Sequence, residues 1–211
     1  ASVGRGVFAD LAAGVPFEQA VARMRANPAL PDGFQGELLT RRLRAEAKAI
    51  AEIAAARRSG ERLPDLPFEL ELPAQADGAR PRLVGQLDRL WRTARIEAEF
   101  GRLGGNREAA LWIRHLVLCA LADQGHALPR ESVGIGRPAS QDRSKRAERH
   151  PVVVFAPVEA PLEILAPLFD LAWRVPEAPL PYFERASRAF AESLISAKEG
   201  DEPSAWRAAR S

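Results

Sequence analysis

Three acidic residues in one short stretch have the types and spacing of a metal site. The segment VGQLDRLWRTARIEAEF, residues 84–100, holds Asp88, followed by Glu97 and Glu99 with one residue between them. If it forms two neighbouring strands, Glu97 and Glu99 project from the same face, because side chains alternate along a strand. Asp88 could reach that side if the register allows. Three converging carboxylates could hold Mg²⁺, which prefers oxygen ligands and can activate water for phosphodiester cleavage.

The same stretch also has a simpler interpretation. Glu97 and Glu99 alternate with apolar residues, which is typical of a strand with one buried and one solvated face. Metal-dependent nuclease sites of this shape usually carry a lysine two positions after the second acid, where it offsets phosphate charge. This chain has Glu99 there, which reverses the charge. Lys48, on a predicted helix, is a less direct source of such a cation.

The elements around this stretch follow from hydrophobic periodicity. Helices are predicted near residues 4–13, 17–26, 35–58, 107–123, 160–174 and 183–198, and Pro167 should kink or split the fifth. Strands are predicted near residues 68–72, 83–91, 94–100 and 151–155, with the second and third as antiparallel neighbours. Residues 128–150 are polar and glycine-containing and predict a long exposed loop. The order predicts an α/β (α+β) fold with a small mixed central sheet flanked by helices.

Composition excludes several classes of protein. The chain has 211 residues and a formal net charge of +2, so any nucleic-acid contact must come from local basic patches. The single cysteine, Cys119, excludes a disulfide within the chain. No apolar run reaches the roughly 18 residues of a membrane span, and no signal peptide is present, which predicts a cytoplasmic location without membrane contact. We expect no cofactor.

Other candidate residues have simple structural interpretations. His115 and Cys119 lie on an apolar helix, where a buried histidine with its hydrogen bonds made and a packed thiol are the common outcomes. Two basic clusters could contact DNA or an acidic partner, or could simply be solvated. They are formed by Arg41, Arg44 and Lys48 on the long helix and by Arg143, Lys145 and Arg146 in the polar segment.

Three motifs resemble one protein family. ALPDGFQGE, residues 29–37, is similar to the "LP.G.FGE" stretch in the C-terminal region of the exodeoxyribonuclease V gamma subunit, RecC, with the phenylalanine one place earlier. LVGQLD, residues 83–88, is similar to its "L.G.LD" strand, and WIRHLVLCAL, residues 112–121, to its "W..HLLLCAL" helix. The order and spacing agree to about residue 195.

The resemblance implies a restriction-endonuclease-like (PD-(D/E)XK) core that has lost catalysis. On this basis residues 1–34 are an N-terminal helical segment, 35–198 the nuclease-like core and 199–211 a polar tail. Asp88, Glu97 and Glu99 are vestigial, with no catalytic or metal role. The expected function is non-catalytic: subunit assembly, DNA positioning and strand separation within an ATP-dependent exodeoxyribonuclease V, a helicase–nuclease that repairs double-strand breaks. RecB-like and RecD-like subunits, double-stranded DNA ends and separated strands are the expected partners.

Two alternatives stay open at this point. One is a Mg²⁺-dependent DNase that uses Asp88, Glu97 and Glu99. The other is a protein–protein interface domain that does not contact DNA.

Overall fold

A computed structural model of the chain describes residues 6, 8–10, 15–26, 33–74, 78–137, 150–174 and 191. The elements in order are α2 (Phe17–Arg25), α3 (Gly33–Arg57), β1 (Leu66–Glu71), β2 (Arg82–Leu87), β3 (Arg95–Arg102), α4 (Gly105–Asp123), β4 (Ser132–Arg137), β5 (Val152–Phe155) and α5 (Pro161–Arg174). This mixture of helices and small sheets confirms the predicted fold class. The predicted helices at 4–13 and 183–198 and the tail lie largely or wholly outside the described residues.

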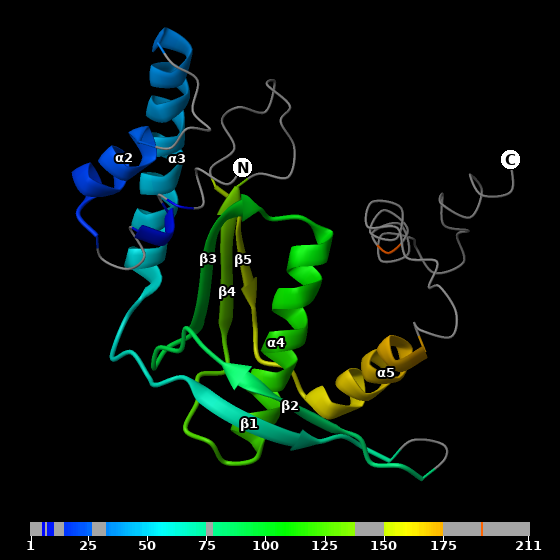
Figure 1. Ribbon diagram of the computed structural model, residues 1–211. Helices are drawn as coiled ribbons and strands as arrows, with labels where there is room; N and C mark the ends of the chain where they lie inside the picture. Colours follow the sequence, from blue (N-terminus) through cyan, green and yellow to red (C-terminus); the bar gives the residue numbers. More distant parts are fainter. Residues whose placement is uncertain are drawn as a thin grey trace, which may run out of the picture.

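The strands form two small sheets. β3, β4 and β5 make a three-stranded sheet, in which β3 is parallel to β4 and β5 is antiparallel to β4. Helix α4 connects the parallel pair, as such a pair requires a crossover. β1 and β2 form a separate antiparallel pair that lies across the lower end of α4 (Figure 1).

Helices cover both faces of the three-stranded sheet (Figure 1). On one face, Ala47, Ile50 and Ala54 of α3 pack in one apolar cluster with alternate residues of β3, among them Ile96 and Phe100. The helix predicted near residues 35–58 is thus confirmed and buries an apolar face, although Leu39, near its start, is exposed. Helix α4 packs over the other face, where the remaining side chains of β3 point.

The predicted pairing of residues 83–91 with 94–100 is wrong. β2 pairs with β1, and the two predicted neighbours meet only through an isolated bridge between Leu90 and Arg95, among the described residues. The cause is local, because Arg89 has a positive φ of 59° and its carbonyl oxygen accepts the N–H of Ile96 at 3.0 Å. This left-handed residue turns the chain out of one sheet before β3 enters the other.

The predicted exposed loop at 128–150 is also wrong over residues 132–137, which form the central strand β4. Val133 and Ile135 alternate with Ser132, Gly134 and Gly136. The glycine and serine content of this segment is typical of a loop, so the strand was missed. Ser132 and Gly134 face α4, and a Cβ added to Gly134 would lie 2.5 Å from Leu111 Cδ1. Glycine is therefore needed for the helix to approach the sheet.

The segment around Pro167 forms one helix. α5 runs from Pro161 to Arg174 with Pro167 inside it, so the proline does not split it. Leu165 of this helix is buried with residues of α4 and of β1 and β2 in a second apolar cluster. This packing compensates for the backbone hydrogen bond that a proline cannot donate.

Candidate functional site

The acids singled out by their spacing converge on a buried arginine. Arg95 Nη2 donates to Glu97 Oε2 at 2.7 Å and to Asp88 Oδ1 at 3.1 Å. The Arg95 side chain is 1% exposed and that of Glu97 is 6% exposed, whereas that of Asp88 is 45% exposed. Asp88 and Glu97 therefore share one guanidinium, although the strand pairing predicted for their segments is wrong.

The solvated-face interpretation, made for Glu97 and Glu99, is wrong for Glu97, whereas the Glu99 side chain is 33% exposed. Arg95 and Glu97 share one face of β3, and α4 covers that face and removes both side chains from water. Arg114 of α4 reaches down from the helix, and its Nη1 donates to Glu97 Oε1 at 3.1 Å and to Oε2 at 3.2 Å. The Glu97 carboxylate thus receives hydrogen bonds from a strand residue and from a helix residue.

Two more arginines reach the acids from the edges of the site. Arg89 Nη1 lies 3.6 Å from Glu97 Oε1 and 3.6 Å from Glu99 Oε1, and Arg89 Nε lies 3.5 Å from Asp88 Oδ2. Arg107, in the first turn of α4, forms an ion pair with Glu99. The left-handed backbone at Arg89 costs on the order of 1 kcal/mol and sets the direction from which its side chain reaches the acids.

These seven side chains form an acid–arginine cluster: Asp88, Arg89, Arg95, Glu97, Glu99, Arg107 and Arg114. The cluster has four guanidiniums and three carboxylates. The guanidiniums lie beside the carboxylate oxygens, where a divalent cation would have to bind. Among the described residues, no group of three or more His, Cys, Asp or Glu side chains is arranged to hold a metal ion. Arg95 Nε and Nη1 are buried without a hydrogen-bond partner among those residues.

The buried histidine has the structural role that the sequence predicted. His115 Nε2 lies 2.8 Å from the carbonyl oxygen of Ala156, which can only accept, so Nε2 carries the proton. Nδ1 then accepts from Ser132 Oγ at 2.9 Å. Burial lowers the pKa of His115, and Arg95 lowers it further, against the opposing effects of Ala156 and Glu131. A neutral imidazole thus joins α4 to β4 and to the chain after β5.

Cys119 is a packed thiol. Its side chain is buried, and burial raises its pKa. A nucleophilic cysteine needs a lowered pKa and access to solvent. The sequence-based interpretation of Cys119 as a core residue is therefore supported by its surroundings.

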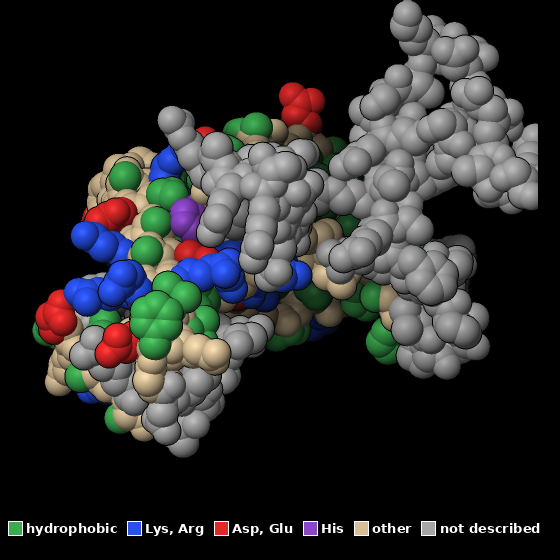
Figure 2. Space-filling model, turned by 90° about the horizontal axis from the view of Figure 1, so that it is seen from above, with side chains coloured by type: hydrophobic (Ala, Val, Ile, Leu, Met, Phe, Trp, Pro, Cys, Tyr) green, Lys and Arg blue, Asp and Glu red, His purple; other side chains and the backbone are tan. Residues whose placement is uncertain are grey.

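The basic face of α3 is partly balanced by acids. Arg44 Nη2 lies 2.6 Å from Glu18 Oε1 of α2, and Lys48 Nζ lies 3.7 Å from Glu52 Oε1. Viewed from above, Lys and Arg side chains lie next to Asp and Glu side chains over the described surface (Figure 2). The second basic cluster, with Arg143, Lys145 and Arg146, lies outside the described residues.

Comparison with known protein families matches residues 2–195 to the model of the RecC C-terminal domain. The chain belongs to the RecC C-terminal domain family. The match covers the range over which the three motifs resembled RecC and confirms that resemblance. Comparison with curated proteins gives no significant match.

Membership of the RecC family implies a role in the RecC subunit of a RecBCD-type complex, and so in DNA repair with RecB-type and RecD-type partners. None of the helices in the described parts of this RecC domain has the length and apolar character needed to cross a membrane.

Sequence reasoning missed four residues of the acid–arginine cluster. Arg95 lies on the same face of β3 as Glu97, and Arg114 lies on α4, which covers that face. Arg89 and Arg107 carried no signal, because their roles depend on a left-handed turn and on how α4 begins. A search for arginines within a few residues of each acid would have found Arg89 and Arg95.

Proposed function

We propose that this RecC domain is a non-catalytic nuclease-like domain that acts in subunit assembly and in positioning and separating DNA strands. The observation that supports this is the pairing of each of the three acids, Asp88, Glu97 and Glu99, with at least one arginine. A guanidinium 2.7 Å from a carboxylate oxygen uses the lone pairs that a metal would need. It also places a positive charge where a second cation would be repelled.

The ion pairs of the acid–arginine cluster would also have a structural role. Arg95 and Glu97 join strand β3 to the turn after β2, and Arg114 and Arg107 join it to α4. A buried pair that loses one partner is strongly destabilising, so these residues hold the two sheets and α4 in register. The domain would then present fixed surfaces to DNA and to neighbouring subunits.

DNA contact is proposed for the basic face of α3 at Arg41, Arg44 and Lys48. Phosphate binding by such residues is electrostatic, so affinity should fall steeply with salt. Arg143, Lys145 and Arg146 are proposed as a second contact on sequence grounds alone.

The test uses the RecC-type subunit that carries this domain. Arg41→Glu with Arg44→Glu should weaken binding to forked duplex DNA and reduce its salt dependence, while RecB-like and RecD-like subunits still co-purify. Arg80→Glu with Arg130→Glu makes the same charge change on other surfaces and serves as the control. Equal DNA binding by the two double variants would contradict DNA positioning by α3.

A second candidate function is a protein–protein interface without DNA contact. Phe34 and Leu38, at the start of α3, are 79% and 56% exposed and lie one helical turn apart. Neighbouring exposed apolar side chains can form part of a surface that another protein covers. Loss of the co-purifying subunits in Phe34→Ser with Leu38→Ser, with unchanged DNA binding, would favour this candidate.

A further inference from the structure

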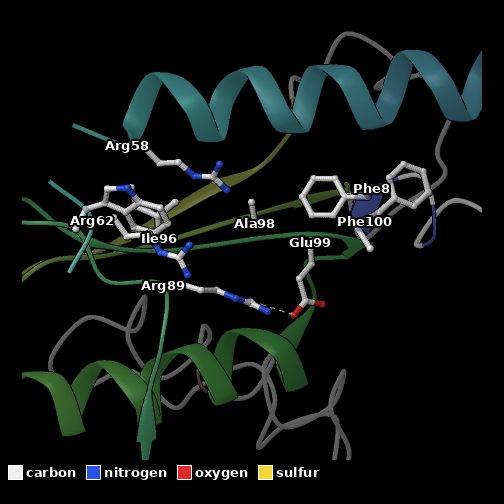
Figure 3. A pocket seen from close by; sticks show the side chains of 10 residues that line it. Phe8, Arg58, Arg62, Arg89, Ile96, Ala98, Glu99 and Phe100 are labelled. Atoms are coloured by element: carbon white, nitrogen blue, oxygen red, sulfur yellow. Dashed lines mark ion pairs between the residues drawn. The ribbon is translucent and has the colours of Figure 1, made fainter. Parts of the chain in front are cut away.

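A pocket of about 500 Å³ opens along β3, next to the acid–arginine cluster. Arg58 and Arg62 line one end, the rings of Phe8 and Phe100 line the other, and Arg89 extends along the pocket towards Glu99 (Figure 3). Arg58 comes from the residue after α3, Arg62 from the chain leading to β1, and Arg89 from the turn after β2. Three segments that are separate in the sequence therefore bring positive charge to one place.

Trp91 holds two of these arginines without neutralising them. The guanidinium carbon of Arg58 lies 5.1 Å from the Trp91 ring centroid, and that of Arg62 lies 6.0 Å from it. Neither arginine has a carboxylate within ion-pair distance among the described residues. A guanidinium that stacks through its face keeps its N–H groups in the ring plane available for an anion.

The arginines also crowd one another. Burial lowers the pKa of Arg58, and the charges of Arg62 and Arg89 lower it further. The one acidic residue that lines the pocket, Glu99, is paired with Arg89 and Arg107. The arginine end of the pocket therefore has an excess of positive charge, which an anion placed between the side chains would relieve.

The shape and chemistry of the pocket select the ligand. Phosphate oxygens fit the planar guanidinium fork, and a volume near 500 Å³ is within the usual range for small-molecule sites. The apolar end suits a flat ring attached to that phosphate. A carboxylate side chain would satisfy one guanidinium and leave the apolar end without a matching group.

We propose that this pocket binds one nucleotide of single-stranded DNA, with its phosphate at Arg58 and Arg62 and its base towards Phe8 and Phe100. The inference rests on the proposed role in DNA positioning and assigns that role a specific site. Arg89 borders both the pocket and the acid–arginine cluster. A bound strand would therefore lie directly beside the former nuclease acids.

The experiment measures fluorescence anisotropy of a labelled oligothymidine of about 12 nucleotides with the full chain over a range of salt concentrations. Arg58→Gln with Arg62→Gln should weaken binding about tenfold or more and lower the salt slope by about 1. Arg58→Lys with Arg62→Lys keeps the charge but loses the planar fork. Its affinity for oligothymidine should therefore lie between those of the unchanged chain and of the glutamine double variant. Arg80→Gln with Arg130→Gln, the matched control, should bind as the unchanged chain does. Thermal unfolding checks that all variants are folded.

Two further probes separate the sources of affinity. An abasic strand of equal length keeps the phosphates and should bind more weakly than oligothymidine. An oligoglutamate peptide should compete poorly. Equal affinity in the pocket variant and the control, no oligothymidine binding, or oligoglutamate binding as tight as that of DNA would each overturn the pocket assignment. Subunit co-purification and the α3 variants would still test the proposed function separately.

Discussion

Arg95 and Glu97, two residues apart on β3, form an ion pair inside the molecule, with Arg95 Nη2 2.7 Å from Glu97 Oε2. Their side chains are 1% and 6% exposed, so neither charge is solvated by bulk water. Burying an ion pair costs desolvation energy, and the pair persists because each member also contacts Asp88 or Arg114. The two acids thus have arginine partners, one of them buried with Glu97 between β3 and α4.

The first prediction concerns this pair. Glu97→Leu should lower the free energy of unfolding by about 3–5 kcal/mol, because it leaves the buried Arg95 charge without its nearest partner. Arg95→Met combined with Glu97→Leu should recover much of that loss, since two apolar side chains can replace a buried pair. Urea denaturation measures both.

Glu69 supplies the control for this prediction. It pairs with Arg82 on the exposed β1–β2 hairpin, so Glu69→Gln should change stability by about 0.5 kcal/mol or less. If Glu97→Leu were as mild as Glu69→Gln, the ion pair would have no structural role.

Stability should depend on pH through His115. Burial lowers its pKa, so the folded chain keeps the imidazole neutral where the unfolded chain, with a pKa near 6.5, binds a proton. The stabilisation is complete above about pH 7 and is lost as the pH falls through about 6.5 towards the lower folded-state pKa. The slope reaches at most about 1.4 kcal/mol per pH unit.

Urea midpoints measured at about pH 7.5, 6.5 and 5.5 test this dependence on the His115 proton. The variant His115→Gln should lose the extra slope over this range. An identical slope in the unchanged chain and the variant would show that His115 is not responsible.

Cys119 should resist thiol reagents. The side chain is buried, and burial raises its pKa, so the reactive thiolate is scarce in the folded chain. Labelling with an aromatic disulfide should be slow in buffer and rapid in denaturing urea. Rapid, stoichiometric labelling of the folded chain would contradict the packed-thiol assignment.

Gly134 should tolerate no side chain while Leu111 is present. A Cβ at this position would lie 2.5 Å from Leu111 Cδ1, so Gly134→Ala should cost about 1–3 kcal/mol by overpacking. In the Leu111→Ala background the same substitution should cost less. Strict additivity of the two substitutions in denaturation experiments would argue against a direct contact between Leu111 and the side chain at position 134.

The long helices could be predicted because their signals are local. The apolar stripe of α3 and the almost wholly apolar α4 have helical periodicity over many residues, and both were located to within about two residues at each end. Whether Asp88 converges with Glu97 was left open, because it depended on the strand register, and the structure brings both acids to Arg95.

The rest depended on tertiary contacts. β4 was missed because its glycines, which allow α4 to approach, also resemble a loop. The antiparallel pairing was wrong because a left-handed arginine at position 89 turns the chain from one sheet into the other. The pocket arginines come from three separate segments that share no local pattern, so only the fold brings Arg58 and Arg62 to Trp91.

The most direct test of the account is a nuclease assay on the purified chain. Linear DNA is incubated with Mg²⁺ or Mn²⁺, beside an Asp88→Ala control. Because Asp88 also accepts a hydrogen bond from the buried Arg95, thermal unfolding checks that the Asp88→Ala chain is folded. Arginines paired with all three acids predict no metal-dependent cleavage and no difference between the two proteins. Metal-dependent cleavage that Asp88→Ala abolishes would contradict the account and restore the DNase alternative.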